Sequence, residues 1–178
     1  MINRLKRLLF KFIRKMIDLI RIFDRQLYQK LFVKYLKYIG LNIVGNPTYI
    51  SNDIFIDDID YSLITIDEGV VISINVVILV HDYAVTRALI ANEQRPKKEL
   101  AIVRPVKIGK NCFVGAGSII LPGTEIGDNV IIGAGSVVKG KIPNNMVVAG
   151  NPLRTLTTIE EYLEKQLTFN KEFLKEDI

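Results

Sequence analysis

Tryptophan is absent from this 178-residue chain, and cysteine and histidine occur once each, as Cys112 and His81. A single cysteine allows no internal disulfide, so a reducing, cytoplasmic location is expected. We interpret Cys112 as a small buried residue rather than a reactive thiol. No uninterrupted apolar run approaches the ~20 residues that span a bilayer, and none resembles the apolar part of a signal peptide. The chain is therefore expected neither to cross a membrane nor to be exported.

Acidic residues are scarce at the N-terminus. Residues 1–38 hold eleven Lys and Arg against Asp18 and Asp24, a net charge of +9, so the +5 of the whole chain leaves −4 for the other 140 residues. Apolar residues recur there at steps of three and four, with basic residues on the opposite side, which predicts a basic amphipathic helical segment over residues 1–40. No base-reading motif accompanies this charge, so nucleic acid is not an expected partner.

Two interpretations of the basic segment stay open. Its apolar face either lies on an anionic membrane surface, through residues 1–38, or packs on the rest of the protein. We favour packing, because the apolar residues continue as far as Tyr38, further than a simple surface anchor requires.

Residues 108–143 consist of six consecutive six-residue units: IGKNCF, VGAGSI, ILPGTE, IGDNVI, IGAGSV and VKGKIP. A period of six fits neither a helix nor an ordinary hairpin, and the wider strand spacing of a β-sandwich does not match it. Asn111 and Asn129 show a second repeat of eighteen residues. We therefore predict a β-solenoid with three short strands to a coil. Its inward-pointing residues are the leading aliphatics Ile108, Val114, Ile120, Ile126, Ile132 and Val138. Sharp bends or close backbone approaches are expected at Gly109, Gly115, Gly127 and Gly133.

From Ile64 to Leu156, ending in Ile142-Pro143 and Ala149-Gly150-Asn151-Pro152, the chain resembles the hexapeptide-repeat acyltransferase family. The resemblance implies a left-handed parallel β-helix, here over residues 41–156, which assembles as a homotrimer and uses acetyl-CoA as donor. Residues 84–105 lack the repeat, and we expect a protruding loop that shapes a binding site. Thr158-Ile159-Glu160-Glu161 is a capping box, so a short helix over 157–178 is expected to close the end of the shaft.

His81 ends an aliphatic run just before that loop, and the run resembles the segment that bears the catalytic histidine in the family. Acetyl transfer to a hydroxyl needs a base with a pKa near neutrality, which imidazole provides. A carboxylate would hold the imidazole in one tautomer. The candidates are Asp57, Asp58 and Asp82.

The family resemblance also implies the donor contacts. Ala116 and Ala134 match positions beside the pantetheine arm of the donor, in a groove between two subunits. Cations near the C-terminal end of the shaft would bind the nucleotide phosphates, and Lys139, Lys141 and Arg154 are the candidates. The acceptor is expected near two further residues, Asn75 and Tyr83.

The predicted function is an acetyl-CoA-dependent O-acetyltransferase acting on a sugar or glycan precursor, of the kind used in capsule or exopolysaccharide synthesis. Serine acetyltransferase, antibiotic acetyltransferase and amino-sugar N-acetyltransferase remain alternatives, and outside the enzymes a non-catalytic β-helix scaffold does. A γ-type carbonic anhydrase is also a left-handed β-helix, but its zinc needs three histidines and this chain has one. No metal cofactor is expected.

Overall fold

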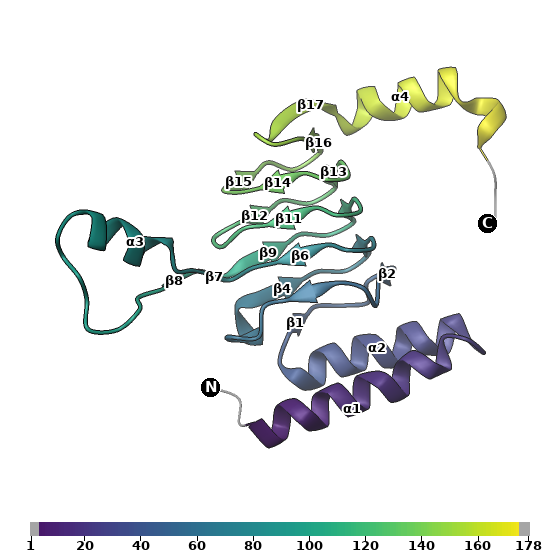
Figure 1. The fold of residues 1–178 in the computed structure, drawn as a ribbon. Helices are drawn as coiled ribbons and strands as arrows, with labels where there is room; N and C mark the ends of the chain where they lie inside the picture. Colours follow the sequence, from purple (N-terminus) through teal and green to yellow (C-terminus); the bar gives the residue numbers. More distant parts are fainter. Residues whose placement is uncertain (1–3, 175–178) are drawn as a thin grey trace.

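The computed structural model describes residues 4–174; residues 1–3 and 175–178, the outer ends of the two predicted helical segments, lie outside the described residues. A column of stacked coils forms the body, with two helices at its N-terminal end and one at its C-terminal end (Figure 1). The predicted β-solenoid, a left-handed β-helix, is thereby confirmed.

Two helices, α1 (Arg4–Ile20) and α2 (Arg25–Ile39), make up the N-terminal segment. The segment bends between them because Asp24 caps α2, its Oδ1 accepting a hydrogen bond from the Leu27 backbone nitrogen at 2.9 Å. Helix α2 packs against β1 (Asn42–Ile43) and β2 (Tyr49–Ile50) of the first coil. Its buried side chains are Tyr28, Phe32, Tyr35, Leu36 and Ile39. The packing expected from the sequence is thus found for α2.

The first four coils each contribute one strand to each of three parallel sheets, and the last coil contributes to the first two sheets. The first sheet contains β1, β4 (Ile64–Ile66), β9 (Val106–Ile108), β12 (Glu125–Ile126) and β15 (Lys141–Ile142). The second contains β2, β5 (Val71–Ile72), β10 (Phe113–Val114), β13 (Ile131–Ile132), β16 (Met146–Ala149) and, antiparallel at its edge, β17 (Arg154–Thr158). The third contains β3 (Phe55–Ile56), β6 (Val77–Ile78), β11 (Ile119–Ile120) and β14 (Val137–Val138). A 3₁₀ turn, Tyr61–Leu63, precedes β4.

The register of the coils follows the eighteen-residue repeat. Ile108 pairs with Ile126, and Val114 pairs with Ile132. All six leading aliphatic residues are at most 1% exposed, so the predicted inward face is confirmed. Amide side chains stack outside the shaft, because Asn111 donates to Asn129 and Asn129 to Asn145.

Glycine at position 115 allows adjacent coils to approach closely. A Cβ atom there would lie 2.5 Å from the Ala134 backbone nitrogen, a distance that real Cβ atoms do not adopt. Close approach, rather than a positive φ, therefore explains the glycine in second place of this unit.

The segment 84–105 is more ordered than a plain loop. Strands β7 (His81–Asp82) and β8 (Ile102–Val103) pair antiparallel and carry helix α3 (Ala84–Ala91) away from the shaft (Figure 1). The buried hydroxyl of Thr86 accepts from the Leu100 nitrogen at 2.8 Å and donates to the Leu100 oxygen at 3.0 Å. We call residues 81–103 the insertion arm.

Helix α4 (Ile159–Phe169) begins at the predicted capping box, in which Thr158 and Glu161 bond reciprocally, and a 3₁₀ turn at Lys171–Phe173 follows it. None of its residues is buried, and it extends beyond the shaft instead of closing it (Figure 1). The reason is β17, which turns back on β16 and occupies the end of the second sheet first. The prediction that this helix closes the shaft is therefore wrong.

Candidate active site

His81 lies where the third strand of the second coil ends and the insertion arm begins. Its Nδ1 atom contacts Oδ2 of Asp57 from the coil below, where β3 and β6 pair with Ile56 opposite Ile78. The Asp57 side chain is 3% exposed, whereas that of His81 is 25% exposed. The structure therefore brings together the predicted base and one of its three candidate partners.

Backbone donors hold the Asp57 carboxylate in place. Its Oδ2 accepts from the Val80 nitrogen at 3.0 Å, and its Oδ1 accepts from the Ile59 nitrogen at 3.2 Å. A buried carboxylate with several donors stays in one orientation. The carboxylate can in turn hold His81 through Nδ1, so that Nε2 is the nitrogen left for a substrate.

The other two aspartates are arranged differently. Asp58 is exposed, and the Asp82 carboxylate accepts from the Ala84 nitrogen at 2.7 Å, at the start of α3. Tyr83 meets the imidazole edge to face, with ring centroids 5.1 Å apart. Asp82 thus shapes the insertion arm, and Tyr83 forms one wall beside His81.

The turns between the second and third sheets stack into a column that we call the alanine corner. Backbone bonds join its levels, from Gly117 to the Ile74 oxygen at 2.9 Å and from Gly135 to the Ala116 oxygen at 2.8 Å. Ala134 is exposed at this corner, and Ala116 is half-buried. One level below, Asn75 adopts a positive φ of 56°, as a turn residue of this corner can.

The three predicted phosphate-binding cations are divided between two corners. Arg154 pairs with Ala149, and the next residue, Gly150, donates its backbone N–H to Ser136 Oγ at 3.0 Å. Arg154 therefore lies at the C-terminal end of the alanine corner. Lys139 instead follows β14, so it lies at the C-terminal ends of the strands of the third sheet, as His81 does. Lys141 forms an ion pair with Glu125 at 3.1 Å.

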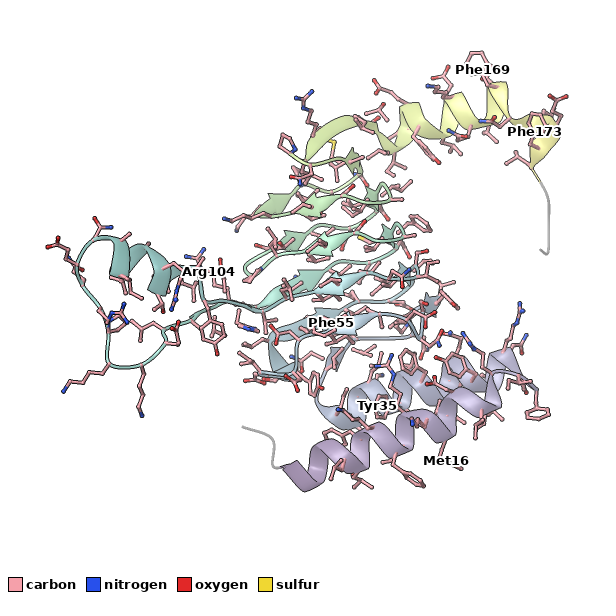
Figure 2. All side chains as sticks on the ribbon, viewed as in Figure 1. Met16, Tyr35, Phe55, Arg104, Phe169 and Phe173 are labelled. Carbon is pink, nitrogen blue, oxygen red and sulfur yellow. The ribbon has the colours of Figure 1, made fainter. Side chains whose placement is uncertain are left out.

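Arg104 was not anticipated from the sequence. It directly follows the insertion arm (Figure 2), and its backbone nitrogen donates to the Val80 oxygen at 2.9 Å. A Cβ on Gly123 would lie 2.9 Å from Arg104 Cδ. The sequence contains both Gly123 and Arg104, but it does not show that they lie next to each other, because their contact depends on how the coils stack.

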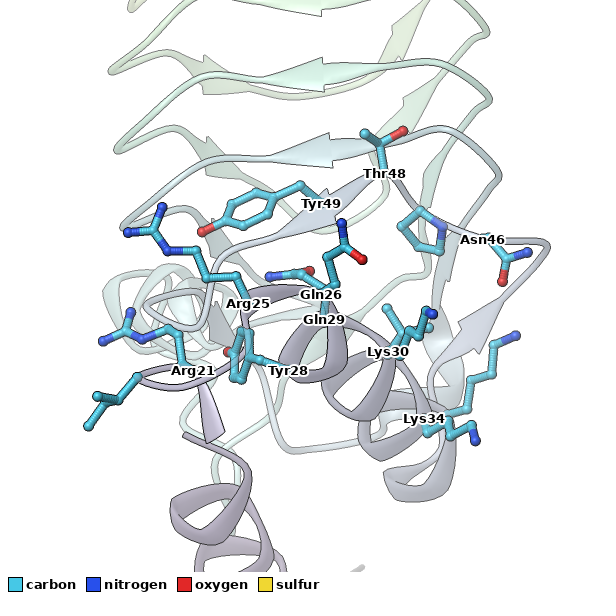
Figure 3. A pocket seen from close by; sticks show the side chains of 14 residues that line it. Arg21, Arg25, Gln26, Tyr28, Gln29, Lys30, Lys34, Asn46, Thr48 and Tyr49 are labelled. Carbon is cyan, nitrogen blue, oxygen red and sulfur yellow. The ribbon is translucent and has the colours of Figure 1, made fainter. Parts of the chain in front are cut away.

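A cleft of about 1200 Å³ opens between α2 and the first coil, and none of the predicted site residues lines it (Figure 3). Within the described part of the chain, no helix is long and apolar enough to cross a membrane. Neither feature bears on the arrangement around His81.

Comparison with known proteins identifies the family. The hexapeptide repeat of succinyl-transferase matches residues 105–139. Protein CapG of Staphylococcus aureus is 35% identical over 156 residues, which cover 83% of this chain and 87% of CapG. This chain belongs to the hexapeptide-repeat acetyltransferase family. The enzymes of that family are CoA-dependent.

Two solved structures resemble this acetyltransferase over most of its length. A galactoside acetyltransferase in complex with coenzyme A has 26% identity and a TM-score of 0.66, with 89% of this chain and 83% of that one covered. A maltose O-acetyltransferase from Clostridium difficile 630 has 26% identity and a TM-score of 0.52, with coverages of 88% and 89%. Both relatives are named for a sugar.

Proposed function

We propose that this acetyltransferase transfers an acetyl group from acetyl-CoA to a hydroxyl of a sugar or glycan precursor. The observation that carries the proposal is the contact between His81 Nδ1 and the buried carboxylate of Asp57. It directs the other ring nitrogen to a substrate beside the insertion arm. The sugar acceptors in the names of the two similar structures support the acceptor class.

In the proposed reaction, Nε2 of His81 accepts the proton of the acceptor hydroxyl while the oxygen attacks the thioester carbonyl. The carbon–sulfur bond then breaks, and the proton passes from His81 to the departing CoA sulfur. Asp57 acts as a positioning residue that stabilises the imidazolium formed in between. A backbone N–H or a similar donor would stabilise the oxyanion.

The donor would lie along the alanine corner. The small side chains of Ala116 and Ala134 leave room for a pantetheine arm, and Arg154 at the end of the corner provides a cation for its phosphates. Asn75 belongs to the same corner, beside the acceptor end of such an arm.

This arrangement favours a homotrimer. Within one chain, His81 and the alanine corner lie at opposite ends of the strands of the third sheet. The alanine corner precedes β6, β11 and β14, whereas His81 follows β6. A donor on the alanine corner would meet the histidine of a neighbouring copy more directly than its own. Lys139, at the same strand ends as His81, would then approach the donor from the neighbour.

A screen of acceptors tests the proposal. Purified protein is mixed with acetyl-CoA and nucleotide sugars, oligosaccharides or serine, and release of the CoA thiol is followed, with His81→Ala as control. Release that depends on a sugar hydroxyl is expected. Release only with serine or with an amino sugar would replace the acceptor class, and no release with any acceptor would favour a non-catalytic scaffold.

A further inference from the structure

Helix α1 and the turn after it expose an unusual amount of apolar surface. Seven large side chains there are between 46% and 88% exposed. We call these residues the apolar stripe: Leu8, Leu9, Phe12, Met16, Leu19, Ile22 and Phe23. Most of them follow steps of three or four residues, so they share one side of the helix.

Packing against the shaft does not use this stripe. The side of α1 that contacts the core consists of other residues, the buried Ile17 and the partly buried Phe10, Ile13 and Ile20. Met16, by contrast, points away from the coils (Figure 2). Helix α1 therefore has an inner apolar face that the fold buries and an outer one that it leaves in solvent.

The cleft between α2 and the first coil adds a concentration of positive charge to the same end of the molecule. Five cations line it, and no aspartate or glutamate is among its described lining residues (Figure 3). These cations are Arg21, Arg25, Lys30, Lys34 and Lys37. Ile22 also lines the cleft, so the cationic surface begins where the apolar stripe ends.

We infer that the α1–α2 hairpin docks on an anionic phospholipid bilayer. The apolar stripe would enter the boundary between headgroups and acyl chains, and the cations of the cleft would bind lipid phosphates. Charge decides between this occupant and a second copy of the chain meeting it end to end. The net charge of +9 over residues 1–38 would repel the same end of another molecule, whereas an anionic surface complements it.

Docking in this way would set the height of the candidate active site. His81 follows the second coil above the hairpin, so two rungs of roughly 5 Å and a helix roughly 10 Å across separate it from the membrane surface. An acceptor carried on a membrane lipid would reach that height. This consequence rests on the proposed function, but the docking itself does not.

Vesicle sedimentation of the full chain tests the apolar stripe. The protein should sediment with vesicles of phosphatidylcholine mixed with phosphatidylglycerol, much less with phosphatidylcholine alone, and be released by rising salt. Phe12→Ser combined with Met16→Ser should lower the partition coefficient by roughly tenfold or more. The matched control is Phe169→Ser with Phe173→Ser, which removes two phenylalanines of similar exposure from the other end of the molecule and should change nothing.

A second pair of variants tests the cleft. Lys30→Glu with Lys34→Glu should weaken binding to the anionic vesicles by roughly tenfold or more. Lys97→Glu with Lys98→Glu makes the same charge change in the insertion arm and should have little effect. Equal binding to neutral and anionic vesicles would overturn the inference. A wild-type protein that does not sediment with vesicles would overturn it as well. If the stripe variant then changed its oligomeric state, a second copy of the chain would be the partner that covers the stripe. CoA binding, measured beside these experiments, reports separately on the acetyltransferase site.

Discussion

The imidazole of His81 contacts the carboxylate of Asp57 although 24 residues separate them, because one complete coil of the solenoid places them on adjacent rungs. The carboxylate is buried and receives two backbone hydrogen bonds, so the pair behaves as one preorganised unit. Preorganisation of this kind lowers the reorganisation that catalysis requires.

Replacing His81 by Ala or Asn should lower turnover by about 100- to 10,000-fold, the range typical of a lost general base. CoA binding should change little, since the donor is proposed to lie on the alanine corner. Steady-state kinetics and a CoA titration measure the two effects. Near-normal turnover in a folded variant would contradict the assignment.

Asp57→Asn should lower turnover by roughly 10- to 1,000-fold, because an amide does not stabilise the imidazolium and does not hold one tautomer. The KM for acetyl-CoA should stay close to its original value. Asp58→Asn is the matched control at the neighbouring, exposed position and should leave turnover within about twofold of wild type. Equal effects of the two substitutions would remove Asp57 from its positioning role.

Ala134→Phe separates a role at the surface from a role in the core. The structure exposes Ala134, so the larger side chain should leave the melting temperature nearly unchanged while it obstructs the donor groove and weakens CoA binding. Thr168→Phe, at an exposed position of α4, controls for added apolar surface. A lowered melting temperature with unchanged CoA affinity would instead indicate overpacking, which typically costs about 1 to 3 kcal/mol.

Burial raises the pKa of the Cys112 thiol from its ordinary 9.0 to about 11. Because the pKa is higher in the folded protein than in the unfolded one, the protonated thiol contributes to the free energy of unfolding. That contribution is complete below pH 9.0 and is lost as the pH rises towards about 11. Cys112→Ser should reduce that pH dependence, and the fold should accept it, since the equivalent Ser118 donates to a backbone oxygen as Cys112 does. Denaturant unfolding of both proteins at a series of alkaline pH values provides the measurement. The same thiol should resist alkylation near neutral pH until the protein unfolds.

Tyr28→Phe should stabilise the protein or leave its stability unchanged. The Tyr28 hydroxyl is buried and, among the described residues, has no hydrogen-bond partner, and an unsatisfied buried polar group is unfavourable. A gain of about 1 kcal/mol would raise the melting temperature by roughly 2 to 4 °C. A clear fall would indicate that the hydroxyl bonds to an ordered water.

The repeats predicted the solenoid well because each six-residue unit has its own inward-pointing aliphatic residue and its own turn. Ile108 and Ile126 occupy the same place in units eighteen residues apart, and the stacked coils give them the same buried environment. The insertion arm was predicted less well, since its order depends on tertiary contacts: the pairing of β7 with β8 and the two hydrogen bonds between Thr86 and Leu100. Helix α4 shows the same limit: the sequence located its capping box but not its direction, which the pairing of β17 with β16 controls.

The candidate site divides in the same way. By itself, the sequence determined the coil architecture, the identity of the single histidine and its place before the insertion, because these depend on local periodicity and on residue type. Only the tertiary structure decided which aspartate meets His81, which corner carries Arg154, and which side of the N-terminal segment stays exposed. Each of these depends on contacts between residues far apart in the chain. Such contacts follow from the register of whole coils and the packing of whole helices, and no short window of sequence contains that information.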